Sequence, residues 1–243
     1  MLLSFSLFGQ VEYYRFPVEK KQEVLSKRLT VEWANDVFFQ TDRYFTNGLR
    51  IEYHDQNLEF FSLSKLLYNP LVESQGYYSF TVTHDIFTPR NTYGNPLPED
   101  RPYAGYLLFG IKSVHFDSDR KFSFSTELQA GMMGKYSGGE MVQNSIHVLL
   151  PASEPIPGWI YQIDNDLCIN YSLGFEQQLF QYKKLKADVL ASGRMGLPYT
   201  DFGGGARIRF SASDDYYSTG RLLQPENFRL SFFAEARMNM VIY

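Results

Sequence analysis

Residues 167–176 read LCINYSLGFE, and this stretch decides the fold. Its odd-numbered positions hold Leu, Ile, Tyr, Leu and Phe, whereas its even-numbered positions hold Cys, Asn, Ser, Gly and Glu. Because successive side chains of a β-strand point to opposite faces, this alternation predicts a strand with one apolar and one more polar face.

The same period of two recurs through most of the chain. Eight further stretches show it, at about residues 29–34, 49–54, 75–83, 104–115, 121–131, 184–194, 206–210 and 228–238. Turn-forming Asp, Asn, Gly and Pro residues separate them. We therefore predict an all-β chain with about nine strands.

Composition narrows the class of protein. The chain has 243 residues, of which 44% are hydrophobic, and a net charge of -4. The hydrophobic fraction argues against disorder, and the charge provides no electrostatic footprint for a nucleic acid. No Gly-, Ser- or Pro-rich linker divides the chain, so we expect one domain. The single cysteine, Cys168, has no partner for an internal disulfide, and its strand position favours a packed side chain over a nucleophile.

Alternation alone fits either a soluble β-sandwich or barrel with an apolar core, or an outer-membrane barrel with its apolar face toward lipid. Strands of about ten residues, and Tyr and Phe gathered near strand ends, favour the antiparallel transmembrane barrel. Residues 1–10 contain a short apolar run that is typical of the end of an export signal, although an ordinary apolar N-terminus remains an alternative. We assign residues 11–28 to a lead-in and residues 29–243 to the barrel.

A polar segment lies between the first two predicted strands. Asn35-Asp36 and the stretch TDRYFTNG at residues 41–48 bring together carboxylate, amide and hydroxyl groups. Oxygen donors of these kinds suit a hard cation such as calcium. The alternative is that Asn35-Asp36 only caps a turn, as these residue types commonly do.

The longest interruption of the strand pattern spans residues 137–166. Gln143 and His147 stand four residues apart within it, so one turn of helix would place them on the same face. Histidine is the usual general base near neutral pH, although His147 could also simply pack a loop helix. The chain has no Gly-x-Ser-x-Gly elbow, His-Glu-x-x-His motif or phosphate loop, so water is the expected nucleophile.

Several short motifs occur in one order and spacing. They are Ala34-Asn35-Asp36, residues 42–48, residues 84–89 (HDIFTP), residues 100–105 (DRPYAG), and Gln143-x-x-x-His147 followed by Gly158-Trp159 and Gln162. Together these motifs resemble the lipid A 3'-O-deacylases, the LpxR family, of Gram-negative outer membranes. The resemblance runs from about residue 29 to the end of the chain, and after residue 183 it lies in the pattern alone.

The resemblance implies a twelve-stranded antiparallel barrel in the outer membrane. Its active site would lie at the outward end, between barrel wall and lipid, and face the outer leaflet. The substrate would be lipid A in lipopolysaccharide, and the protein a monomer. The implied reaction is calcium-dependent ester hydrolysis that removes the 3'-acyloxyacyl chain, by a mechanism similar to that of phospholipase A2.

The resemblance also implies roles for individual residues. His147 would be the general base, Asn35 and Gln143 would position polar groups, and Asp36 with Thr46 would lie in or beside the calcium site. Arg90, Arg101 and Glu154 would contact the substrate, although an arginine at a strand end is also commonly interfacial. Glu154 matches only with a one-residue gap before Trp159. Val37 stands where the family can carry a second aspartate, so calcium binding is expected to be weaker or altered.

The sequence leaves open how the barrel closes and whether the protein is an enzyme. A single-chain bacterial barrel has an even number of strands, so about nine strands before Tyr243 predict that the last strands are missing. A non-enzymatic barrel, acting as a pore or surface-binding protein, is the alternative to the enzyme. A soluble exported β-protein that binds carbohydrate is the third possibility.

Overall fold

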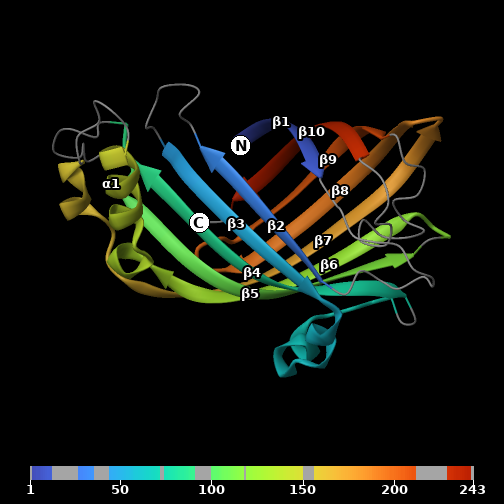
Figure 1. The fold of residues 1–243 in the computed structure, drawn as a ribbon, viewed down its shortest axis with the longest axis horizontal. Coiled ribbons are helices and arrows are strands. Elements are labelled where there is room, and N and C mark those ends of the chain that lie inside the picture. Colours follow the sequence, from blue (N-terminus) through green and yellow to red (C-terminus); the bar gives the residue numbers. More distant parts are fainter. Residues whose placement is uncertain are drawn as a thin grey trace.

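One antiparallel sheet of ten strands organises the chain (Figure 1). The computed structural model describes residues 2–12, 27–35, 44–71, 74–90, 100–117, 119–149, 156–211 and 229–241. The strands are β1 (Leu2–Glu12), β2 (Lys27–Asn35), β3 (Tyr44–Asp55), β4 (Gln75–Thr88), β5 (Ala104–Asp117), β6 (Phe122–Met133), β7 (Asp166–Tyr182), β8 (Leu185–Gly196), β9 (Asp201–Ser211) and β10 (Arg229–Val241). All nine strands predicted from alternation are confirmed as β2 to β10.

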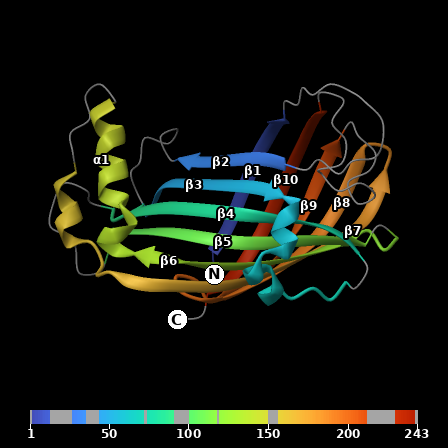
Figure 2. The same ribbon diagram turned by 60° about the horizontal axis from the view of Figure 1, so that its bottom comes forward.

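The remaining strand, β1, occupies the segment that was interpreted from its sequence as the end of an export signal. In the structure it pairs with β10. The sheet order is β1-β10-β9-β8-β7-β6-β5-β4-β3-β2, so β1 and β2 are its edges. Figures 1 and 2 show that the sheet curls into an open half-barrel.

Two connections carry helices. Between β3 and β4 lie the 3-10 helices η2 (Gln56–Phe60) and η3 (Ser62–Leu66). Between β6 and β7 lie η4 (Gly134–Ser137), α1 (Gly139–Leu149) and η5 (Pro157–Tyr161), which confirms the short helix predicted in this connection. Among the described residues, no helix combines the length and apolar character needed to cross a membrane.

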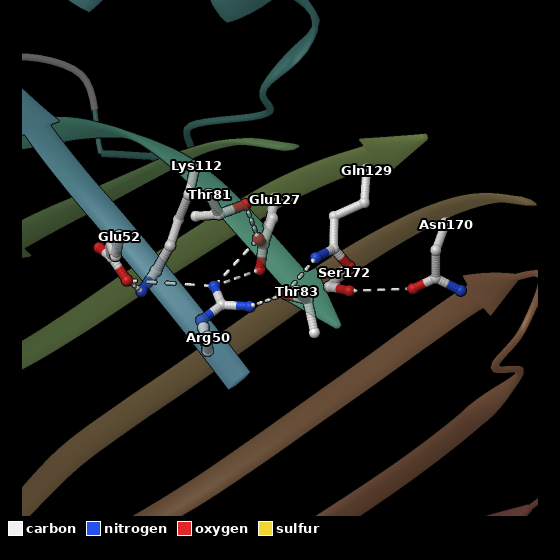
Figure 3. A network of polar contacts seen from close by, with 9 residues as sticks. All are labelled: Arg50, Glu52, Thr81, Thr83, Lys112, Glu127, Gln129, Asn170 and Ser172. Carbon is white, nitrogen blue, oxygen red and sulfur yellow. Dashed lines mark hydrogen bonds and ion pairs between the residues drawn. The ribbon is translucent and has the colours of Figure 1, made fainter. Parts of the chain in front are cut away.

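A network of charged side chains identifies the concave face of the sheet (Figure 3). Arg50 on β3 donates through Nη2 to both carboxylate oxygens of Glu127 on β6, each at 3.0 Å. Two strands, β4 and β5, separate them, so on a flat sheet their backbones would lie roughly 14 Å apart. The two side chains meet because the sheet curls toward them. Lys112 on β5 reaches Glu52 on β3 in the same way, at 3.0 Å.

The polar concave face continues across the second half of the sheet. Arg207 on β9 lies 2.9 Å from Glu176 on β7 and 2.5 Å from Glu235 on β10. Arg209 binds Asp188 on β8 through two hydrogen bonds, at 2.5 and 2.7 Å. Charged groups from β3 to β10 therefore line the inside of the curl.

The opposite face of the strands is apolar and exposed. It carries Leu29, Val31, Trp33, Phe80, Phe109, Ile169, Leu173, Phe175, Ile208, Phe210, Met238 and Met240. Trp33, for example, is 65% exposed. A polar interior with an apolar exterior is the pattern of an outer-membrane barrel, whereas a soluble sandwich would bury its apolar faces in a core. The sandwich alternative is therefore wrong.

Candidate functional site

A β-bulge places Thr46 at one end of the sheet. The pairing of β3 with β4 shifts from Phe45 opposite Phe87 to Asn47 opposite Ile86, which leaves Thr46 as the extra residue. Bulges of this kind redirect a side chain and often occur beside active sites. The Thr46 hydroxyl lies 2.8 Å from that of Thr88, and both side chains are buried. The residue predicted to bind metal thus belongs to a buried pair of hydroxyls.

The end of β2 lies against this bulge. Asn35, the last residue of β2, is paired with Asn47. The amide oxygen of Asn47 accepts a hydrogen bond of 2.6 Å from Nε1 of Trp33. The strands therefore bring position 35 next to the Thr46 bulge. Asp36 follows directly in the chain but lies outside the described residues.

Helix α1 packs at this same end, on the apolar outer face. Val142 of α1 contacts a buried cluster formed by Ile86, Tyr103, Ile156 and Trp159. Ile86 is the residue paired with Asn47, so the helix and the bulge share one end of β4. Figures 1 and 2 both show α1 at one end of the curled sheet.

His84 fixes the chain immediately before α1. Its Nε2 lies 3.0 Å from the carbonyl oxygen of Ser137, and both residues are buried. Further along, Asn144 accepts a hydrogen bond of 3.0 Å from the backbone N–H of Ile156. The contact with Ser137 gives His84 a role in anchoring the helix.

The side-chain amide of Gln143 is buried and oriented by Trp159. Its Oε1 accepts a hydrogen bond of 2.8 Å from Trp159 Nε1. An indole N–H can only donate, so the oxygen of the amide must face Trp159 and the NH₂ group must face away. That Nε2 is buried and has no hydrogen-bond partner within the described part of the chain. A buried donor without a partner is costly, so a water molecule or a bound molecule would stabilise this NH₂ group.

Position 147 follows Gln143 by one turn of α1. The helix extends to Leu149, so the predicted spacing is realised and both positions share one face of the helix. The side chain of His147 is not among those described, and Glu154 lies outside the described residues. The structure thus confirms the helical placement of Gln143 and His147.

The two arginines predicted to bind substrate lie close together. The carboxylate of Asp100 accepts the backbone N–H of Arg90 at 2.6 Å and that of Arg101 at 2.9 Å. Both arginine side chains are exposed. Asp100 therefore holds the backbones of Arg90 and Arg101 close together beyond the end of β4, although these residues stand eleven positions apart in sequence.

Sequence reasoning did not identify the supports of this site. A Cβ at Gly139 would lie 2.9 Å from Cη2 of Trp159, so α1 approaches the indole closely only because this residue is glycine. A Cβ at Gly158 would lie 2.4 Å from the hydroxyl oxygen of Tyr103. Gly158, beside Trp159, was visible in the sequence. The reason for a glycine at this position is its close contact with Tyr103, which the sequence alone does not reveal.

The donor chemistry at Thr46 suits a hard cation only in part. The described oxygens are the neutral hydroxyls of Thr46 and Thr88 and the amide of Asn47. Calcium sites combine such oxygens with carboxylates, and Asp36 would supply one from the position directly after β2. No group of three or more His, Cys, Asp or Glu residues with metal-binding geometry occurs among the described residues.

Comparison with known families resolves the identity of this barrel. The model of the family described as "Outer membrane protein LpxR" matches residues 3–243. The chain belongs to the LpxR family. This membership, together with the polar interior and apolar exterior of the sheet, makes it an outer-membrane β-barrel protein.

A solved structure supports the LpxR fold. LpxR from Salmonella typhimurium superimposes with a TM-score of 0.68 at 19% sequence identity, covering 89% of this chain and 77% of that one. The two proteins thus share a fold across most of their lengths. No match was found among curated proteins.

Proposed function

We propose that this LpxR-family protein is a lipid A 3'-O-deacylase, an esterase that hydrolyses the 3'-acyloxyacyl chain of lipid A. Membership of the family supports this proposal. The observation that carries it is the buried amide of Gln143, which Trp159 orients so that its NH₂ group has no partner among the described residues. This donor lies one helical turn before His147, at one end of the barrel and on its lipid-facing side.

In the proposed reaction, His147 accepts a proton from water as the water oxygen attacks the carbonyl carbon of the 3'-ester. A tetrahedral oxyanion forms and collapses, breaking the bond to the 3'-oxygen of the sugar. His147 returns its proton to that oxygen. The products are lipid A with a free 3'-hydroxyl and the released acyloxyacyl fatty acid.

Gln143 would orient the reacting groups. Its NH₂ group can donate to an ester or water oxygen without moving, because Trp159 already holds the amide. Asn35 would contribute a second amide from the end of β2. Such prepositioned donors stabilise developing charge without reorganising during the reaction.

Asp36 and Thr46 would hold a calcium ion where β2 ends and β3 begins. When bound, calcium would supply positive charge that polarises the ester carbonyl. Val37 offers no second carboxylate at the next position, so the ligand set would depend more heavily on neutral oxygens such as the Thr46 hydroxyl.

Three residues in the connections between strands, Arg90, Arg101 and Glu154, would recognise the substrate. Arg90 and Arg101, whose backbones both bind Asp100, would bind the phosphates of lipid A, for which guanidinium groups are well suited. Glu154 would contact the sugar or its hydroxyls. A site on the outward side of the barrel would receive lipid A laterally from the outer leaflet, and one protein chain would suffice.

Mass spectrometry of lipid A after incubation with detergent-folded protein tests this function. We expect a loss of mass equal to one acyloxyacyl group, which disappears with a calcium chelator and in His147→Ala. The matched control is His115→Ala, which removes a histidine at the opposite end of the outer face and should retain activity. If folded protein leaves the mass of lipid A unchanged, the proposed esterase activity is wrong and a binding role is favoured.

A further inference from the structure

The connection between β3 and β4 is long for its end of the barrel. It spans residues 56–74, of which 56–71 and 74 are described, whereas β7 and β8 at that end are joined by Lys183 and Lys184 alone. We call its residues 56–71 the β3–β4 connector. Because hairpins at one end of such barrels are usually short, a long connection that carries its own helices calls for an explanation.

The connector folds back onto the outer face of the sheet. Tyr171 of β7 donates its hydroxyl to the carbonyl of Leu66 at 2.9 Å and accepts the backbone N–H of Tyr68 at 2.9 Å. Thr126 of β6 donates to the carbonyl of Tyr68 at 2.6 Å. Figures 1 and 2 show the helices of the connector, in cyan, at the end of the sheet opposite to α1. It is therefore held in place by at least two strands.

Polar side chains lie beneath the connector, on the face that is otherwise apolar. Ser113, His115 and Thr126 are 1%, 6% and 1% exposed. His115 Nδ1 lies 3.1 Å from the amide nitrogen of Asn69, within the connector. Polar groups at these positions would be costly against lipid tails, so the connector shields them.

The exposed surface of the connector is rich in apolar side chains, beside the charged Glu59 and Lys65. It exposes large apolar side chains at Phe60, Phe61, Leu63, Leu66 and Tyr68, of which Phe60 is 81% and Leu66 57% exposed. Leaving such side chains in water, rather than burying them, forgoes the favourable free energy of removing apolar surface from water. The connector thus replaces a polar part of the outer face with an apolar one.

We propose that the β3–β4 connector is a membrane-binding element that lies in the lipid interface beside the barrel. Its apolar side continues the lipid-facing band formed by Phe80, Phe109, Leu173 and Phe175. Lys65 is exposed beside these residues and suits anionic phospholipid head groups, whereas exposed Glu59 opposes them. The inference rests on the outer-membrane fold and is independent of deacylation.

Spin labels in vesicles test the proposal directly. Full-length Cys168→Ala protein would be folded into vesicles of phosphatidylethanolamine and phosphatidylglycerol and labelled at Leu66→Cys. Collisions of the label with oxygen, which concentrates in lipid, are compared with collisions with a water-soluble nickel chelate. The matched controls are labels at Phe109→Cys, on the lipid-facing band, and at Asp119→Cys, in the exposed turn between β5 and β6.

We expect the ratio of oxygen to nickel collisions at position 66 to approach that at 109 and exceed that at 119. A ratio equal to that at 119 would place the connector in water and overturn the proposal. A label shielded from both reagents would show that the connector is covered by protein, which also overturns it.

A second variant separates membrane binding from folding. Phe60→Ser/Leu66→Ser removes two exposed apolar side chains, so we expect slower folding into vesicles but an unchanged yield in detergent micelles. The control Glu59→Ser/Lys65→Ser alters exposed residues of the same segment without removing apolar surface. Equal vesicle folding rates for the unsubstituted protein and the apolar double variant would contradict the proposal.

Discussion

At the scale of a single residue, the orientation of the Gln143 amide depends on one indole N–H. Trp159→Phe retains most of the ring and its packing but leaves the amide oxygen without its donor. Loss of a partner for a buried acceptor costs about 1–3 kcal/mol of the free energy of unfolding. We expect that loss in urea unfolding, with a lower deacylation rate because the NH₂ group is no longer fixed.

A double-mutant cycle with Gln143→Leu isolates this contact. In the absence of Gln143, Trp159→Phe should cost less stability, because no buried amide is left without a partner. The coupling energy should be about 1 kcal/mol, as for a typical hydrogen bond between neutral groups. Strictly additive effects would show that Trp159 acts through packing alone.

The Thr46 and Thr88 hydroxyls provide a paired test of the metal assignment. Valine retains the shape of threonine but removes its oxygen ligand. If Thr46 binds calcium, Thr46→Val should raise the calcium concentration needed for half-maximal deacylation by roughly tenfold. Thr88→Val removes the partner hydroxyl and should have a smaller effect. Equal calcium titration curves for Thr46→Val and the unsubstituted protein would contradict the assignment.

Local spacing explains which of these residues could be found from the sequence. Gln143 and His147 are one helical turn apart, so a periodic rule places them together. Trp159 is sixteen positions from Gln143. Asp100 binds the backbone of Arg90 across the connection between β4 and β5. Their partners are set by how the chain folds back on the sheet, which no local period encodes.

At the scale of a secondary-structure element, α1 depends on contacts outside itself. A helix of eleven residues is marginal alone in water, so its stability must come from packing. His84→Ala removes the side chain that contacts the Ser137 carbonyl, and we expect faster amide hydrogen exchange across residues 139–149. Exchange within β5 to β7 should remain unchanged.

The matched control for this prediction is His54→Ala. His54 is buried near the end of β3 that is opposite to the Thr46 bulge and α1, and its Nδ1 lies 2.8 Å from the carbonyl oxygen of Tyr78. It should therefore leave exchange in α1 unchanged. If both substitutions accelerate exchange in α1 equally, the His84 contact is not a specific anchor.

The positions of the strands could be predicted from the sequence more completely than the way in which the strands pair. Alternation predicted β2 to β10 because each strand has distinct inner and outer faces. It did not predict the bulge at Thr46, since one additional residue in β3 becomes visible only against its partner β4. Leu2–Glu12 also alternates, with apolar Leu3, Phe5 and Leu7 on either side of Ser4 and Ser6, but its apolar run is equally typical of an export signal. Its pairing with β10 joins opposite ends of the sequence, which no local pattern encodes.

At the scale of the whole molecule, curvature decides which face is interior. The alternating pattern could not distinguish a soluble sandwich from a membrane barrel, because both have one apolar and one polar face. The pairing of Arg50 with Glu127 across two intervening strands requires the polar face to be concave. The ion pairs between distant strands therefore show which face is the interior, which the alternating pattern alone could not.

The same network predicts how the barrel responds to loss of a charge. Glu127→Ala leaves Arg50 without its bidentate acceptor and removes the acceptor of the 2.6 Å hydrogen bond from Thr81. We expect a loss of about 2–4 kcal/mol in the free energy of unfolding, measured with urea in lipid vesicles. Arg50→Met/Glu127→Met removes both charges and should be closer to neutral, since neither partner is left without the other. A double variant that is less stable than Glu127→Ala would show that the ion pair itself, rather than the cost of an uncompensated charge, maintains the curl.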